Sequence, residues 1–290
     1  MTDLPTAPSA TATPWRTGLR RFRRHPAAMA SVVFLLVVVA GAVFAGPLSG
    51  DPNAIDLRHT REAPSGAHWL GTDPTGRDVF SRLLHAAQVS LGVGLAAAAF
   101  AVVLGAVLGA LAGLLGRWVD GVVMRLADIF MSFPILVVIV VVAGLLGPSV
   151  PAMIMAIGVF QWPVCGRIVR GVTLSLREQE YLLAARAAGA SSGWLMIRHV
   201  IPAALPPICV AATFATAQAI GLEATFSFLG LGVQPPTPSW GNMLTDAQSL
   251  TVIADQPWLW LSPGIAVALT VLAVNFVGDG LRDAVDPRQA

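Results

Sequence analysis

The amino-acid sequence predicts an all-α integral membrane protein with six transmembrane helices, and two observations carry that prediction. The first is composition: 55% of the residues are hydrophobic and 12% are charged, with a mean hydropathy of +0.71, whereas about a quarter of the residues in a soluble domain are charged. The second is the length of the apolar runs, since a helix needs roughly 20 apolar residues to cross the hydrocarbon layer. Six runs meet this need and cover roughly residues 27–46, 89–115, 119–146, 150–169, 203–222 and 259–277.

The N-terminal part of the chain differs from the rest in composition. Residues 1–14 are rich in Thr, Ala and Pro without periodicity, which predicts a disordered tail. In residues 15–26, the apolar side chains Trp15, Leu19 and Phe22 fall on one helical face among five arginines. This pattern predicts an amphipathic helix lying on an anionic membrane surface. The alternative is the basic start of a signal peptide, but the apolar run that follows is too long for an ordinary cleaved signal and is expected to be retained.

The arginines predict the orientation in the membrane. The chain divides into a first transmembrane helix with an outer loop (27–87), a core of five transmembrane helices (88–281) and a terminal tail (282–290). With the N-terminus inside, all but four of the 18 basic residues fall on the cytoplasmic side, as the positive-inside rule requires. The four outside are Arg58, Arg61, Arg77 and Arg82. Both termini and the loop over 178–202 are therefore expected in the cytoplasm.

The sequence also excludes several activities. All of its basic residues are arginines, so the chain lacks the lysine that a phosphate-binding P-loop requires. Any ATP chemistry must come from a different polypeptide. The sequence contains no His-Glu-x-x-His, and no Gly-x-Ser-x-Gly accompanies a credible His and Asp. We therefore expect no catalytic residues, no metal site and no enzymatic activity of the chain by itself.

The cytoplasmic loop over 178–202 is predicted to form two short helices. Residues 181–188 are good helix formers, and Gly189 stands where such a helix would end in the left-handed conformation. Ser191 and Ser192 can cap a second helix, which Pro202 is expected to close. The alanines and glycine present almost no side-chain volume, so a partner could approach the backbone closely. The alternative is an amphipathic linker that is merely rich in alanine.

This loop resembles the EAA loop of binding-protein-dependent ABC importer permeases in the placing of Ala184, Ala185, Gly189 and the pair Ile201-Pro202. In that family the loop docks onto the ATPase subunit. Leu183 stands where the family most often has Glu, and His199 where many members have Ile, so one expected polar contact is missing. The residues that the resemblance assigns to ATPase docking are Glu180, Tyr181, Ala184, Ala185, Arg186, Gly189, Ala190, Trp194, His199 and Pro202.

Three further stretches resemble the C-type permease of oligopeptide, dipeptide and nickel importers. They are Gly-Thr-Asp-x-x-Gly-Arg-Asp-x-x-Ser-Arg at 71–82, Phe-Leu-Gly-Leu-Gly followed by Pro-Pro-x-Pro-x-Trp-Gly at 228–241, and Gly-Asp-x-Leu-Arg-Asp from residue 278. In the first stretch, residues 72–74 are expected to start a turn or helix, across which Arg77 and Asp78 could pair. The resemblance covers nearly everything from Trp15 onward.

The resemblance implies the ABC importer permease fold with a cytoplasmic EAA coupling loop. It also implies an ATP-driven importer, most readily of di- or oligopeptides, in a bacterial inner membrane. The expected partners are a second homologous permease subunit that completes a heterodimer, two ATPase subunits that hold ATP and Mg, an extracytoplasmic substrate-binding protein and membrane lipid. No cofactor on this chain and no nucleic acid are expected. Nickel, glutathione or haem-like cargo remain alternatives. A self-contained secondary transporter would need intramembrane ionisable clusters or repeated halves, which the sequence lacks.

Three polar residues within or at the ends of apolar runs are candidates for the translocation path. Glu223 lies near the end of the fifth run, and an unpaired carboxylate there is costly enough to suggest function. The competing interpretation, which we favour, is a helix-end residue bonded to the Gly- and Ser-rich backbone beyond it. Gln161 and Gln218 are the other candidates. Gln161 begins the Gln-Trp-Pro interruption that makes the fourth run the weakest of the six.

Overall fold

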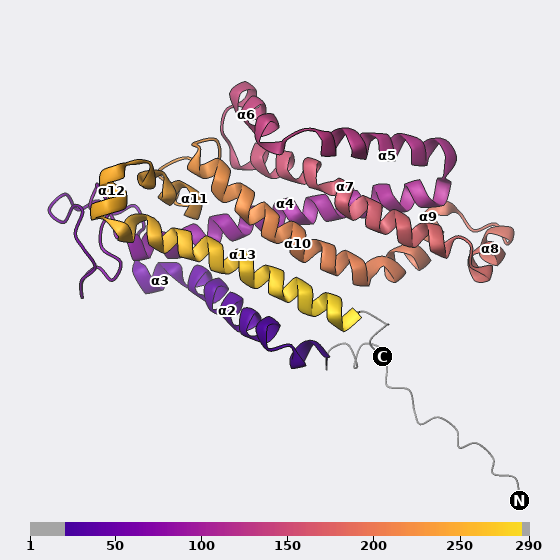
Figure 1. Cartoon of the computed structure of the whole chain (residues 1–290), viewed down its shortest axis with the longest axis horizontal. Helices are drawn as coiled ribbons and strands as arrows, with labels where there is room; N and C mark the ends of the chain where they lie inside the picture. The colour runs from indigo at the N-terminus through magenta and orange to yellow at the C-terminus, as the bar shows by residue number, and fades with distance from the viewer. Residues whose placement is uncertain (1–20, 286–290) are drawn as a thin grey trace, which may run out of the picture.

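The computed structural model describes residues 21–285, which form long helices joined by short helices and loops (Figure 1), with one isolated β-bridge between Thr72 and Asp78. The predicted disordered tail lies outside these residues, as does most of the amphipathic helix expected over 15–26, of which residues 21–24 are helical. The last five residues of the predicted C-terminal tail also lie outside. The described part of the chain is therefore all-helical, as the sequence predicts.

Five helices are long and apolar enough to cross a membrane: α2 (Pro26–Val43), α4 (Val79–Leu115), α7 (Val150–Leu176), α10 (Ile201–Phe228) and α13 (Pro257–Val285). A sixth span forms if α5 (Arg117–Ser132) and α6 (Ile135–Leu146) are taken together. Shorter helices connect them, namely α3 (Ala45–Ser49), α8 (Glu180–Ala187), α9 (Ser192–Leu195), α11 (Trp240–Met243) and α12 (Leu250–Asp255). α10 packs on α4, α7 and α13, while α2 packs on α13 and α4 (Figure 1).

The third predicted span, over 119–146, is not a single straight helix. α5 and α6 meet at an angle of 87°, and the break falls at Phe133 and Pro134. Proline disfavours the helical conformation of the residue before it, and Phe133 is accordingly extended, with φ −92° and ψ 132°. By contrast, Pro163 leaves α7 unbroken over 27 residues. The fourth run is thus a continuous helix despite its polar interruption.

α4 begins ten residues before the apolar run from which it was predicted. Asp78 caps the helix by accepting a hydrogen bond from the backbone N–H of Ser81 at 2.7 Å, which fixes its start. The first turns carry polar side chains that bond to protein rather than face lipid. Arg82 lies 3.4 Å from the carbonyl of Pro52, and Gln88 donates to the carbonyl of Ala42 at 2.6 Å. Hydropathy alone misses these turns because they are polar.

Glycines bring α4 and α7 into backbone contact. A Cβ added at Gly105 would lie 2.6 Å from the carbonyl oxygen of Trp162, and one at Gly113 would lie 2.5 Å from the Cβ of Thr173. Between them, a Cβ at Gly109 would overlap the carbonyl oxygen of Gly166. The three glycines repeat every four residues on one helical face, which is the small-residue pattern of closely packed membrane helices. They allow the backbones of the two central helices to lie in direct contact.

At the end of the molecule opposite α8, the loop before α4 is organised around Asp73. Its carboxylate accepts hydrogen bonds from the backbone and hydroxyl of Thr75 at 2.8 and 2.7 Å, and from Nε of Arg77 at 2.6 Å. The expected pairing of Arg77 with Asp78 is wrong. Asp78 is already engaged in capping α4 and in contact with His68 at 2.8 Å, so Arg77 pairs with Asp73 instead.

These bonds predict a pH dependence of the loop. Burial alone would raise the pKa of Asp73, but hydrogen bonds from Thr75 and Arg77 and the Arg77 charge together hold that pKa below its ordinary value. Stabilisation by a carboxylate of lowered pKa is complete above its unfolded pKa of about 4 and is lost as the pH falls through the lowered value. The contribution of Asp73 to thermal stability should therefore be constant between about pH 5 and 7 and should fall below about pH 4.

The substitution Asp73→Asn tests this assignment. It should lower the unfolding free energy by about 1–3 kcal/mol at neutral pH, because the loop loses its charged acceptor, and it should flatten the decline below pH 4. Asp51→Asn is a matched control, since Asp51 accepts one exposed hydrogen bond, from the N–H of Asn53. Equal stability of Asp73→Asn and Asp51→Asn across this pH range would contradict the assignment.

Candidate functional site

We use "coupling segment" for residues 178–202, the loop with the predicted docking role. Its first helix, α8, ends at Ala187 and is followed by a turn in which Gly189 has a φ of +90°. The N–H of Gly189 bonds to the carbonyl of Arg186 at 2.9 Å, and the N–H of Ala190 bonds to that of Ala185 at 3.0 Å. Ser191 then caps α9 by accepting from the N–H of Trp194 at 3.3 Å. The turn and the cap both lie where the sequence predicts them.

The second half of the coupling segment does not end at Pro202. After α9, the chain forms a π-helical turn (η1, Met196–Val200) that runs directly into α10 at Ile201. Pro202 occupies the first turn of α10, where a helix needs no N–H donor and where proline is well tolerated. The expectation that Pro202 closes the second helix is therefore wrong. As a result, the coupling segment is a direct extension of a membrane-spanning helix.

Apolar side chains and Arg186 hold the coupling segment against α4 and α7, and Arg177, which directly precedes the segment, bonds to α4 as well. Leu182, Leu195 and Val200 are fully buried in a cluster that also contains residues of both helices. Arg186 donates to the carbonyl of Leu114 at 3.2 Å, and Arg177 donates to that of Gly113 at 3.4 Å. These carbonyls belong to the last turn of α4, where helix carbonyls lack intrahelical partners and attract cations. The coupling segment is thus anchored on α4 and α7 and continues into α10.

This anchoring divides the ten predicted docking residues into two groups. Arg186 points inward to α4, while Ala185 and Ala190 pack against the buried cluster. His199 is also partly buried and lies between the rings of Tyr181 and Trp194, at centroid distances of 5.7 and 5.2 Å. The exposed docking candidates are Glu180, Tyr181, Ala184, Gly189, Trp194 and Pro202.

Two exposed apolar residues extend this surface beyond the predicted set. Leu183 is 51% exposed and Ile197 is 71% exposed. Leu183 stands where the resemblance leads one to expect Glu, and that departure was a signal of its exposure. No motif in the sequence marks Ile197, which lies in the π-helical turn. A Cβ added at Gly189 would meet nothing within 4 Å, so the space beside this residue is open to a partner.

Ion pairs hold α5 against α7. Arg170 pairs with Asp120 through two hydrogen bonds, one of them 2.6 Å long, and Arg167 pairs with Asp128 at 2.6 Å. Both arginines lie within α7 rather than in a loop. The first pair is partly buried and bidentate, a geometry that gives arginine–carboxylate pairs their directional strength.

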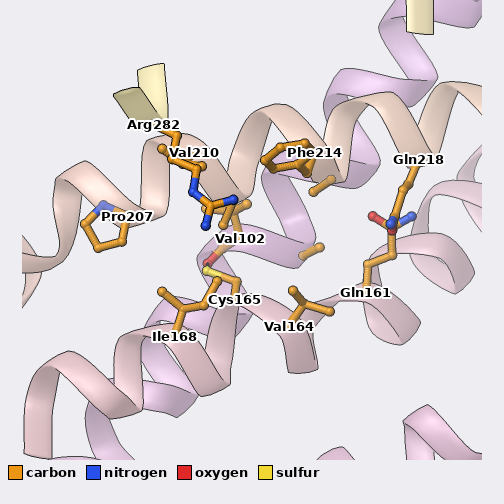
Figure 2. A pocket seen from close by; sticks show the side chains of 13 residues that line it. Val102, Gln161, Val164, Cys165, Ile168, Pro207, Val210, Phe214, Gln218 and Arg282 are labelled. Atoms are coloured by element: carbon orange, nitrogen blue, oxygen red, sulfur yellow. Dashed lines mark hydrogen bonds between the residues drawn. The ribbon is translucent and has the colours of Figure 1, made fainter. Parts of the chain in front are cut away.

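A cavity of about 580 Å³ lies among α4, α7 and α10, and Arg282 of α13 lines one part of it (Figure 2). Two of the three predicted path residues, Gln161 and Gln218, line this cavity. The amide nitrogen and oxygen of Gln161 are both buried without a hydrogen-bond partner in the described part of the chain. The sequence did not predict Arg282 as a lining residue, because it lies more than 60 positions after the other lining residues and no motif links it to them.

The third predicted path residue, Glu223, does not line this cavity. It is fully buried, and the hydroxyl of Ser227 donates to its Oε1 at 2.8 Å. Ser90 of α4 and Ser239, which caps α11, lie near the carboxyl group. The Oγ atoms of Ser90, Ser227 and Ser239 each accept a backbone N–H, at 3.1, 3.1 and 3.2 Å, while Oε2 of Glu223 is buried without a hydrogen-bond partner in the described part of the chain. This geometry favours a structural role that ties α4, α10 and α11 together.

Family models match two parts of this chain. Residues 105–290 match the binding-protein-dependent transport system inner membrane component, and residues 13–64 match the N-terminal transmembrane domain of oligopeptide transport permease C. A solved structure, the inward-facing MetNI methionine ABC transporter, aligns with a TM-score of 0.55 at 21% identity, over 70% of this chain and 96% of the matched chain. The structural likeness concerns the fold.

Curated relatives are similar over nearly their full lengths. A putative peptide permease of Brucella suis biovar 1 is 43% identical, over 95% of this chain and 91% of its own. A dipeptide transport system permease of Alkalihalophilus pseudofirmus is 38% identical over 95% and 90%, and a glutathione transport system permease of Pectobacterium atrosepticum is 40% identical over 95% and 92%.

The apolar helices and the family matches together define a membrane-embedded transport subunit. The chain belongs to the family of binding-protein-dependent transport system inner membrane components. Its N-terminal match and its relatives identify it as a permease subunit of an ABC importer, of the kind found in peptide systems.

Proposed function

We propose that this chain forms half of the translocation path of an ATP-driven importer of di- or oligopeptides. The other half is a homologous permease subunit, and the motor consists of two ATPase subunits that hold ATP and Mg. A substrate-binding protein delivers cargo from outside, and the complex resides in a bacterial inner membrane with both termini of this chain in the cytoplasm. The relatives named for peptide, dipeptide and glutathione transport support this cargo class, since glutathione is itself a small peptide.

The observation that carries the proposal is the construction of the coupling segment. One side is fixed to α4 and α7 by buried Leu182 and Leu195 and by the bond from Arg186 to the end of α4. The other side exposes the apolar and aromatic groups Leu183 and Trp194. Exposed apolar patches of this kind mark surfaces that bind another protein. This face therefore suits docking to a separate protein.

The same construction supports a mechanism for coupling. Because η1 continues into α10 without a break, displacement of the docked segment moves α10 as a rigid extension. The bonds from Arg177 and Arg186 to the last carbonyls of α4 transmit the same displacement to that helix. α4 and α10 are two of the helices that line the cavity, so closure of the ATPase pair would change the cavity directly.

Affinity purification tests the proposal. The tagged chain is purified from its native membrane in mild detergent, and the proteins that accompany it are identified by mass spectrometry. We expect to recover a Walker-motif ATPase, a second permease and a binding protein. In a separate assay, the binding protein loaded with peptide should stimulate ATP hydrolysis by the purified complex. Recovery of the chain alone or only with copies of itself would overturn the proposal and favour a self-contained transporter.

A further inference from the structure

The cavity contains a polar group that folding does not explain. Gln161 buries both polar atoms of its amide without a hydrogen-bond partner in the described part of the chain. A buried donor or acceptor that is left unpaired destabilises the folded state. Figure 2 shows the side chains of Gln161 and Gln218 directed toward one another at one end of the cavity. This end can therefore donate and accept hydrogen bonds, which are the two requirements of a peptide group.

The other end of the cavity carries a positive charge. Arg282 reaches from α13 toward the cavity beside Val210, away from the two glutamines (Figure 2). A guanidinium group presents a planar set of donors that matches a carboxylate. Within residues 21–285, no carboxylate lies within ion-pair distance of this side chain. Arg282 is therefore available to an anionic ligand.

Between these ends the lining is apolar. Ile168 and Val164 come from α7, and Phe214 and Val210 come from α10. Val210 and Gln218 lie about 12 Å apart along the axis of α10, at 1.5 Å per residue. An extended chain rises about 3.3–3.6 Å per residue, so a peptide of two to four residues spans this distance with the reach of the side chains. A volume of about 580 Å³ suits a ligand of that size.

We propose that this cavity is a transient cargo site within the permease, in which Arg282 binds the terminal carboxylate of a short peptide and Gln161 and Gln218 bind a backbone amide. The inference rests on the proposed import of peptides and adds the contacts that select them. The apolar middle accepts side chains of varied shape, so recognition depends on groups that every short peptide carries. Such a site holds cargo weakly after the binding protein releases it.

The test uses the complete complex in nanodiscs, without its binding protein. Saturation-transfer NMR measures binding of trialanine and of trialanine amide, which lacks the terminal carboxylate. We expect the wild-type complex to bind trialanine at least about fivefold better than the amide. Arg282→Gln should remove this preference, and Gln161→Leu should weaken binding of both probes severalfold. Because the Gln161 amide is unpaired, Gln161→Leu should keep or raise thermal stability, which a purely structural residue would not do.

Two control variants carry the same chemical changes away from the cavity. Arg125→Gln removes an arginine of α5, and Gln248→Leu removes a glutamine that bonds to the carbonyl of Phe228. Both should bind the two probes as the wild type does. Equal binding of trialanine and its amide by the wild type would overturn the inference. Loss of the second permease from Gln161→Leu complexes would also overturn it, because the cavity would then be a subunit interface.

Peptide uptake by the same complex with its binding protein separates this inference from the proposed function. A wild-type complex that imports peptide but shows none of the expected differences between variants contradicts the cargo site alone. A wild-type complex that imports no peptide, with intact ATP hydrolysis, contradicts the peptide function itself.

Discussion

Alanine in place of Gly109 is expected to prevent the chain from reaching its native packing. A Cβ at this position would overlap the carbonyl oxygen of Gly166 and would lie 3.0 Å from its Cα. Both obstacles are backbone atoms, so no side-chain rotation relieves the overlap, and α4 and α7 must separate. Overpacking of a close-packed interior costs about 1–3 kcal/mol and sometimes more, and we expect about 3 kcal/mol here.

Gly92→Ala is the matched control for this prediction. Gly92 belongs to the same helix, but a Cβ added there meets nothing within 4 Å. Membrane yield and thermal unfolding in detergent should be close to wild type for Gly92→Ala and sharply reduced for Gly109→Ala. If the two variants behave alike, the contact between α4 and α7 is looser than the structure places it.

Tryptophan in place of Gly189 is expected to abolish ATPase association while leaving membrane insertion intact. Gly189 adopts a φ of +90°, and a residue with a Cβ pays roughly 1–2 kcal/mol for a left-handed conformation. No atom of this chain lies within 4 Å of the added Cβ, so the new side chain meets no obstacle in the chain itself. It would instead occupy the space that we assign to the ATPase. Co-purification should fall at least tenfold, with unchanged yield of the chain itself.

Gly189→Asn separates the backbone from the surface in this experiment. Asparagine enters the left-handed region more readily than most residues and adds far less volume than tryptophan. We expect it to retain most of the associated ATPase. Normal recovery of the ATPase with Gly189→Trp would show that docking does not involve this turn, and the coupling segment would then need another role.

Features that depend on nearby residues could be predicted from the sequence. The apolar runs predicted the spanning helices, because crossing a membrane is a matter of length and composition. The left-handed turn at Gly189 and the cap at Ser191 were predicted because each depends on residues within one turn of the helix. The bend at Phe133 has an equally local cause in Pro134, but the surrounding apolar run concealed it.

Features that combine distant residues were decided only by the tertiary structure. Arg186, a predicted docking residue, also serves as an anchor because the end of α4, some 70 positions earlier, offers carbonyls without intrahelical partners. The surroundings of Glu223 depend on serines from three segments. The cavity joins Gln161 with Arg282 from different helices. Hydropathy and periodicity describe one helix at a time, whereas pairing and cavities arise from the way the helices pack. The sequence by itself therefore determined the helices and the coupling turn, while packing determined which polar groups face a partner, the cavity or the interior.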